Sequence, residues 1–263
     1  MKKDVLIVGY GVVGKNLAKE LEVLQPDIYD IKFVDYEDRR KSHYDFCFIC
    51  VDTPHTKEHP CDITQVKNAI RDNNADIYII KSTILPGTTD FLSKSMSKSI
   101  IFSPEYYGET QHCNNFDFNF TILGGEKEDC LKVQQLLQSV YDARHTFHIV
   151  DSRTAELVKY MENSWLATKV SFCVQFFELA RNYSVDYETL RELFTLDPRV
   201  NPSHTFVYED SPYWESHCLD KDVLAIVEDN ELSTTLKENK ENCAQFLKDV
   251  IEYNRRCKEK WKI

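Results

Sequence analysis

The chain has 263 residues, of which 42% are hydrophobic and 29% are charged, and its formal net charge is -11. This length and composition indicate a folded globular protein with one large domain and a smaller one, and they exclude a disordered tail. The negative charge argues against sequence-independent binding to nucleic acid, because such binding needs clustered Lys and Arg. No apolar run reaches eighteen residues and glycines break the first one, so we expect neither a membrane span nor export.

The chain opens with a short apolar run, Val5–Val8, that leads into three closely spaced glycines and then into a helix-compatible stretch. A strand, a glycine turn and a helix start in this order predict a dinucleotide site. The first glycine permits the tight turn, the second lets the backbone approach a pyrophosphate, and the third lets helix and strand pack closely. The helix N-terminus then holds the anion. The cofactor-binding residues expected here are Gly9, Gly11, Val12, Val13 and Gly14.

The next apolar run, Ile31–Val34, ends at Asp35, at about the spacing expected of a ribose-binding acid. A carboxylate at this position accepts a hydrogen bond from the ribose hydroxyl of NAD and repels the additional phosphate of NADP. Arg39 and Arg40 follow closely enough to soften that repulsion. The sequence therefore favours NAD as the cofactor.

Short β-branched runs alternate with helical patterns through the first half of the chain. Further strands are expected at Tyr44–Val51, Asp76–Lys81, Ser99–Phe102 and Phe120–Leu123. This alternation predicts an α/β fold with a Rossmann-type, doubly wound parallel sheet. The later pattern predicts helices at Ser152–Tyr183, at Tyr187–Phe194 and from about Leu232 to the end. We therefore expect an NAD-binding domain over residues 1–150 and an all-helical domain over residues 151–263.

Nine cysteines occur without the regular spacing of a disulfide framework, which fits a reducing, cytoplasmic environment. Cys47 and Cys50 fall within a predicted strand, so we expect their side chains on opposite faces of the sheet. His55, His59 and Cys61 lie in a polar connection without a second ligand pair, and we expect a solvated loop there and no metal.

Two predicted strands end in Pro-containing turns, at the edge where a doubly wound sheet binds its ligands. The cofactor-binding residues expected there are Val51, Thr53 and Pro54 at the end of one strand, and Ser82 and Thr83 at the end of the next. We expect these turns to line a cofactor cleft. Ordinary strand-to-helix turns, with Ser and Thr as helix caps, would explain either turn alone.

Three further segments combine chemically useful side chains. Residues 103–109 place two acids, Glu105 and Glu109, beside aromatic residues at a strand end. Lys159 and Asn163 are four residues apart on the long predicted helix and so share one face. The sequence Cys-Leu-Asp-Lys-Asp at residues 218–222 holds a cysteine near lysine, an arrangement that favours the nucleophilic thiolate.

Together these segments resemble the UDP-glucose and GDP-mannose dehydrogenase family, in the same order over nearly the whole chain. The matching blocks are GYGVVG, VDTP, KSTILPGTT, SPEYYGET, ELVKYMENSWLATKVSF, Asp197-Pro198-Arg199, CLDKD and NRRCKEKW. The resemblance implies an NAD-dependent, two-step, four-electron oxidation of the primary alcohol of a nucleotide sugar, similar to UDP-glucose, to a carboxylate. It also implies a homodimer formed through the helix at Ser152–Tyr183.

The resemblance further implies a role for each catalytic residue. Cys218 would capture the intermediate aldehyde as a thiohemiacetal, which then becomes a thioester. Lys159 and Asn163 would stabilise developing oxyanions. Asp222 would hold or deprotonate a water, and Glu105 would position the water that hydrolyses the thioester. Contacts to the cofactor or the substrate are implied for Thr83, Tyr106, Tyr107, Glu109, Lys221 and Arg199, the last across the dimer interface.

The chain departs from the family pattern at several positions. Bulky and acidic residues at 212–217 replace a glycine-rich loop that wraps the nucleotide sugar, and Asp220 replaces a proline. Val174 and Gln175 stand where the family usually has Asn and Glu. The family continues into a second Rossmann-like domain where this chain ends, so we expect weak binding of UDP-sugars.

Two other functions stay open at this point. The first is a two-electron dehydrogenase of the hydroxyacid type, in which Cys218 is incidental. The second is a catalytically impaired, NAD-binding dimer that acts as a scaffold.

Overall fold

The structure is a computed structural model that describes residues 3–32, 40–107, 118–236 and 243–262. The chain divides into two compact units, Met1–Lys159 and Tyr160–Ile263, and each is described by itself. The boundary between them falls inside a long helix, nine residues after the boundary expected at residue 150.

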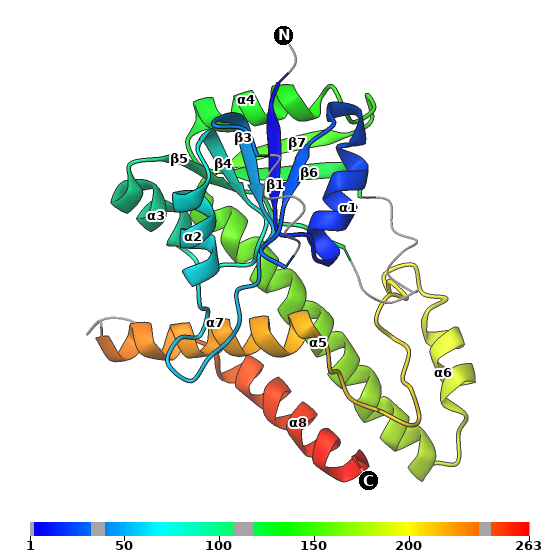
Figure 1. The fold of residues 1–263 in the computed structure, drawn as a ribbon. Coiled ribbons are helices and arrows are strands. Elements are labelled where there is room, and N and C mark those ends of the chain that lie inside the picture. The colour runs from blue at the N-terminus through cyan, green and yellow to red at the C-terminus, as the bar shows by residue number, and fades with distance from the viewer. Residues whose placement is uncertain (1–2, 33–39, 108–117, 237–242, 263) are drawn as a thin grey trace. The chain divides into compact units, whose positions relative to one another are not determined.

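The first unit is built on a twisted sheet with helices on both faces (Figure 1). Its described strands are β1 (Val5–Val8), β2 (Asp27–Tyr29), β3 (Tyr44–Ile49), β4 (Ala75–Ile80), β5 (Ser99–Phe102), β6 (Phe120–Gly124) and β7 (Thr146–Val150). They lie in the order β2-β1-β3-β4-β5-β6-β7, and every neighbouring pair is parallel except β5 and β6. The predicted α/β class with a Rossmann sheet is confirmed, with one antiparallel pair that the sequence did not predict.

Helices cover both faces of this sheet. They are α1 (Val12–Glu20), the 3₁₀ turn η1 (Glu22–Leu24), α2 (Thr64–Asp72), α3 (Thr88–Met96), α4 (Lys127–Leu137) and the first turns of α5 (Ser152–Asn182). One buried cluster joins α2, α3 and the start of α5 to one face, and a second joins α1 and α4 to the other. Cys47 belongs to the first cluster and Cys50 to the second, so the prediction that they face opposite ways is confirmed.

Strand β2 corrects the sequence-based prediction. The structure places it at Asp27–Tyr29, paired with β1 through Leu6 and Val8, whereas the predicted strand began at Ile31. Ile31 lies in a turn and is 74% exposed. Strand β2 lies at the edge of the sheet, and its three residues are all half-buried. It therefore lacks the continuous apolar run from which a buried strand can be predicted.

The second unit is helical and holds the rest of α5, then α6 (Tyr187–Phe194), α7 (His217–Leu236) and α8 (Gln245–Trp261). Its buried core includes Ala167, Trp214 and Val223. The predicted helices at the positions of α5 and α6 are confirmed. The single helix expected from Leu232 to the end is wrong, because Cys243 and Ala244 are not helical and α8 starts after them. Helix α7 was not predicted.

Candidate active site

The glycine turn after β1 has the geometry that a dinucleotide site requires. Gly9 has a φ of +94°, in the left-handed region, and a Cβ there would lie 2.5 Å from the carbonyl oxygen of Cys50. A Cβ at Gly14 would lie 1.9 Å from the carbonyl oxygen of Gly9, which explains the close packing of helix on strand. A Cβ at Gly11 would meet open space.

The N-terminus of α1 is suited to binding an anion. The helix begins at Val12, directly after Gly11, and no side chain caps it. Its first backbone N–H groups therefore remain available to a ligand, and the helix dipole favours negative charge there. The expected fit of a pyrophosphate at residues 9–14 is consistent with this open approach.

An acid stands at the end of β2, at a position that the sequence analysis missed. Asp30 follows the last residue of β2, and its carboxylate accepts hydrogen bonds from the backbone N–H of Tyr10 at 2.7 Å and of Lys32 at 2.8 Å. Asp30 is thereby tied directly to the glycine turn. The predicted acid, Asp35, lies outside the described residues.

The turns after β3 and β4 are bonded to each other. Thr53 donates its hydroxyl hydrogen to the carbonyl oxygen of Thr83 at 2.7 Å, and Ser82 donates to the carbonyl oxygen of Val51 at 2.6 Å. Thr53, Ser82 and Thr83 are buried, and Pro54 lies in the same turn as Thr53. The structure therefore brings these two predicted segments together at the carboxyl edge of the sheet, where doubly wound folds bind ligands.

A buried carboxylate holds the loop that follows Thr83. Glu156 of α5 is fully buried and accepts hydrogen bonds from the backbone N–H groups of Gly87 and Thr89 and from the hydroxyl of Thr89. Those N–H groups belong to the start of α3, so Glu156 acts as its cap from another helix. Burial raises the pKa of Glu156. Sequence reasoning missed this residue because its partners lie 67 to 69 positions earlier.

Glu105 and Lys159 form a buried pair in the first unit. The two side chains are 8% and 7% exposed, and Lys159 Nζ lies 3.9 Å from Glu105 Oε1. The other carboxylate oxygen of Glu105 accepts from the backbone N–H of Tyr107 at 2.8 Å. Lys159 Nζ also lies 5.1 Å from the ring centre of Tyr106. Four of the predicted residues thus meet in one group.

A second lysine supports the same turn. Lys81, at the end of β4, donates to the hydroxyl of Ser103 at 3.1 Å and to the carbonyl oxygen of Pro104 at 3.2 Å. Burial lowers the pKa of Lys81, and the negative charge of Glu105 opposes that effect. Lys81 belongs to one of the blocks that resemble the family, but no role was predicted for it.

The second unit holds another polar group. Asn163 of α5 donates from its side-chain amide to Asp222 Oδ2 at 2.6 Å, and Lys221 forms an ion pair with the other carboxylate oxygen. Asp222 is 1% exposed. A carboxylate this deeply buried requires such partners, because an unpaired charge would be strongly disfavoured. The structure therefore brings three of the sequence-predicted residues into contact.

Cys218 stands in the first turn of α7, four residues before Asp222, so the two share a helix face. Its side chain is half-buried. The dipole of a helix favours negative charge in its first turn, and a thiolate carries such a charge. By contrast, burial raises the pKa of Cys50 to about 12, which keeps that thiol protonated at neutral pH.

Two other predicted residues are less informative. Arg199 has an 87% exposed side chain, and its guanidinium bonds Asp197 in the loop after α6. Glu109 lies outside the described residues.

No group of three or more metal-binding side chains occurs in the part of the chain that the structure describes. Within that part, every helix is also too short or too polar to span a bilayer.

Comparisons with known proteins define the class. Residues 30–145 match the NAD binding domain of the UDP-glucose/GDP-mannose dehydrogenase family, and residues 153–256 match its central domain. The chain belongs to this family, and its amino-terminal part is an NAD-binding domain.

Individual relatives agree with this assignment. The chain is 28% identical to the UDP-N-acetyl-D-mannosamine dehydrogenase of Methanocaldococcus jannaschii over 79% of its length and 51% of the relative's. It is 26% identical to the UDP-glucose 6-dehydrogenase of Rickettsia prowazekii, over 86% of its length and 52% of the relative's. The chain thus spans about half the length of these curated relatives. A UDP-glucose dehydrogenase structure from Pyrobaculum islandicum shares the fold, with a TM-score of 0.80, 21% identity, and coverage of 97% of this chain and 68% of that one.

Proposed function

We propose that the protein oxidises the primary alcohol of a nucleotide sugar, similar to UDP-glucose, to the uronic acid, in two NAD-dependent steps. The observation that carries this proposal is the buried carboxylate of Asp222, held by Asn163 and Lys221 one helical turn from the half-buried Cys218. A scaffold has no physical need to keep a buried acid beside a nucleophile. Curated relatives that act on UDP-glucose and on UDP-N-acetyl-D-mannosamine support the nucleotide-sugar class.

The cofactor site would be formed by residues 9–14 together with the turns at Val51–Pro54 and Ser82–Thr83, within a functional domain that ends near residue 150. NAD held by these residues would supply the hydride acceptor that each of the two oxidation steps needs. We assign the ribose-binding role to Asp30 in place of Asp35, because Asp30 ends β2 and is bonded to the glycine turn. Its negative charge would also repel the additional phosphate of NADP.

In the first oxidation, Asp222 would take the proton of the sugar hydroxyl through a water. Lys159 and Asn163 would stabilise the negative charge that develops on the substrate oxygen. The product of this step is an aldehyde. Cys218 would then attack the aldehyde carbon, so that a carbon–sulfur bond forms and the carbonyl oxygen takes up a proton.

In the second oxidation, the thiohemiacetal carbon loses a hydride and its hydroxyl loses a proton, which leaves a thioester. Glu105 would position a water and accept its proton as the water attacks. The carbon–sulfur bond then breaks, Cys218 leaves as the thiolate, and the carboxylate product is released. The buried position of Glu105, with Lys159 at 3.9 Å, supports a role at a developing charge.

The test measures how many NADH molecules form for each acid product, with a panel of UDP- and GDP-sugars as substrates and NADH absorbance as the signal. The wild-type protein should form two NADH for each acid. Cys218→Ser should stop after the first oxidation or lose activity, and Glu105→Gln should accumulate a covalent adduct on Cys218, visible by intact-protein mass spectrometry. One NADH per product, with Cys218→Ser fully active, would exclude the thioester route.

We also propose that the protein acts in the cytoplasm as a homodimer formed through α5. Cysteines that lack the regular spacing of a disulfide framework support a reducing compartment. An exposed apolar row on α5 supports the dimer, and its members are Met161, Trp165, Phe172, Phe176 and Tyr183. In the same arrangement, the exposed Arg199 would reach the substrate bound to the partner subunit.

A further inference from the structure

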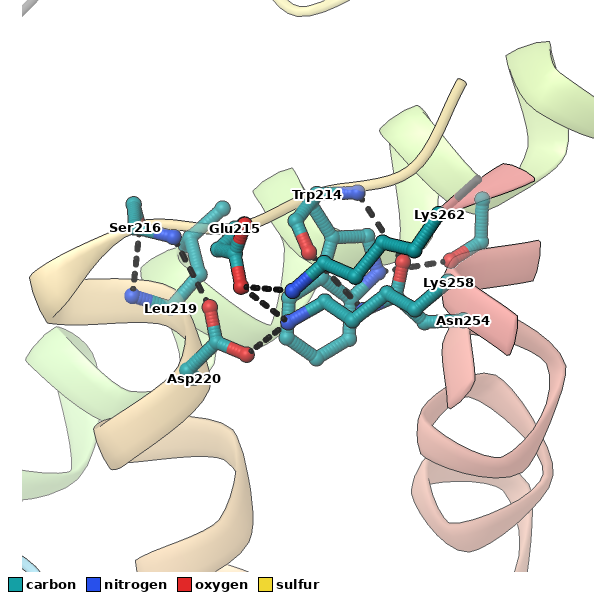
Figure 2. A network of polar contacts seen from close by, with 9 residues as sticks. Trp214, Glu215, Ser216, Leu219, Asp220, Asn254, Lys258 and Lys262 are labelled. Carbon is teal, nitrogen blue, oxygen red and sulfur yellow. Dashed lines mark hydrogen bonds and ion pairs between the residues drawn. The ribbon is translucent and has the colours of Figure 1, made fainter. Parts of the chain in front are cut away.

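The loop that precedes Cys218 is fastened to α8 by a buried asparagine (Figure 2). The backbone N–H of Trp214 donates to Asn254 Oδ1 at 2.9 Å, and Asn254 Nδ2 donates to the carbonyl oxygen of Trp214 at 2.9 Å. Asn254 is 3% exposed. One side chain thus satisfies both backbone groups of Trp214, as a neighbouring strand would.

The indole of Trp214 is held on its other side. Its Nε1–H donates to the hydroxyl of Ser171 on α5 at 2.9 Å, and the ring belongs to the core of the second unit. Trp214 is therefore fixed through both its backbone and its side chain. The loop has little freedom to change conformation at this residue.

Two residues further on, the loop forms the cap of α7. The hydroxyl of Ser216 accepts from the backbone N–H of Leu219 at 2.9 Å, and the backbone N–H of Ser216 donates to Asp220 Oδ2 at 2.8 Å. This reciprocal pair resembles a capping box and sets where the helix begins. Cys218 lies inside the first turn that this cap defines, so its position depends on the position of the loop.

Lysines of α8 add ion pairs to the same cap. Lys258 Nζ lies 2.6 Å from Asp220 Oδ1 and 3.6 Å from Glu215 Oε1, and Lys262 Nζ lies 2.8 Å from Glu215 Oε1. Ion pairs at exposed positions contribute little, and Glu215 and Lys262 are each about half exposed. Leaving two buried backbone groups without partners has a larger effect. Asn254 should therefore matter most, Lys258 less, and Lys262 least.

We propose that Asn254 is a positioning residue for Cys218, which it holds in place through Trp214 and the cap of α7, with Lys258 as a secondary support. The proposal rests on the proposed function in one respect, because it takes Cys218 as the nucleophile. Nothing in the proposed chemistry requires Asn254 to touch the substrate, so its effect should be on the rate of the thiol step.

The first test is amide hydrogen exchange of the whole protein. Asn254→Ala removes both bonds and should accelerate exchange at the Trp214 amide about tenfold or more. Asn254→Asp keeps an acceptor for that amide but loses the donor to the carbonyl oxygen of Trp214, so exchange should be accelerated less than in Asn254→Ala. Lys260→Met is the matched control, because Lys260 of the same helix pairs with Glu178 and not with the loop.

The second test follows the thiol itself. Alkylation of Cys218 by iodoacetamide, measured by mass spectrometry of its peptide, should become severalfold faster in Asn254→Ala, because a loosened cap exposes the sulfur. The kcat should fall about tenfold while the KM for NAD stays unchanged. Lys258→Met should show smaller changes in the same direction, and Lys260→Met should show none.

The outcomes separate this inference from the proposed function. Unchanged exchange at Trp214, or faster exchange with unchanged alkylation and kcat, would overturn the positioning role. If Cys218→Ser stays fully active, the thioester route fails, while exchange and alkylation still decide whether Asn254 positions the thiol. If Asn254→Ala does not fold, the exchange and alkylation measurements are made on Asn254→Asp and Lys258→Met, and circular dichroism verifies that these variants fold.

Discussion

Gly9 and Gly11 are two residues apart in the same turn, yet they meet different physical demands. Gly9 needs a positive φ and has no room for a Cβ beside Cys50. Gly11 has an ordinary φ of -76° and open space around an added Cβ. The first glycine is therefore required by the fold, whereas the fold sets no such requirement at the second, which we expect to serve a ligand that approaches closely.

This difference predicts that one alanine variant mainly loses stability and the other mainly loses NAD binding. Gly9→Ala should lower the free energy of unfolding by about 2 kcal/mol or more, from backbone strain and the clash with Cys50. Gly11→Ala should lower it by at most about 1 kcal/mol but weaken NAD binding markedly. Urea denaturation and calorimetric titration with NAD measure the two effects. Equal losses of stability in both variants would contradict this assignment.

At the scale of elements, Glu156 joins α5 to the start of α3. Its pKa is raised by burial, so between the ordinary carboxyl range and this raised value the folded protein binds more protons than the unfolded chain. The contribution of Glu156 to stability is therefore fully present at low pH and falls as pH rises through that window.

Glu156→Gln removes this titration and replaces a carboxyl oxygen that accepts from the α3 start with an amide NH2 group, which cannot accept a hydrogen bond. The variant should be less stable than the wild type by about 2 kcal/mol at acidic pH, and the gap should narrow as pH rises. Urea denaturation of both proteins at several pH values is the measurement. Glu126→Gln, which changes a carboxylate at the start of α4 that caps no backbone group, serves as the control. If the difference in free energy of unfolding between the wild type and Glu156→Gln widened with rising pH, the predicted direction of the pH dependence would be wrong.

At the scale of the whole molecule, the exposed row on α5 predicts self-association. Met161, Trp165, Phe172 and Phe176 recur at spacings of four and seven residues, the pattern of a helix–helix seam. Trp165 is 60% exposed and Met161 is 76% exposed, so the row forms an apolar patch of the kind that marks an interface.

Trp165→Asp should shift the protein from dimer to monomer in analytical ultracentrifugation, because a charge would be buried without a partner. Phe246→Asp is the control, since Phe246 of α8 is 63% exposed but lies outside this row. A wild-type protein that stays monomeric at high micromolar concentration would rule out the proposed dimer.

Local sequence patterns were enough to predict the class of the fold, the glycine turn, the opposite faces of Cys47 and Cys50, and the positions of β1, β5, α5 and α6. These features are encoded by periodicity and turn chemistry among adjacent residues, which act before any distant contact forms. The candidate residues Glu105, Lys159, Asn163 and Asp222 were also found in the sequence, through a resemblance carried by several blocks in order.

The partners of these residues could be identified only from the packed fold. It placed β2 at Asp27–Tyr29, with Asp30 directly after it, because an edge strand gains its identity from pairing and not from its own apolar content. Lys81, Glu156 and Asn254 have partners 22, 67 to 69, and 40 positions away, respectively. No local pattern encodes such pairs, since their geometry exists only after the sheet and the helices have packed.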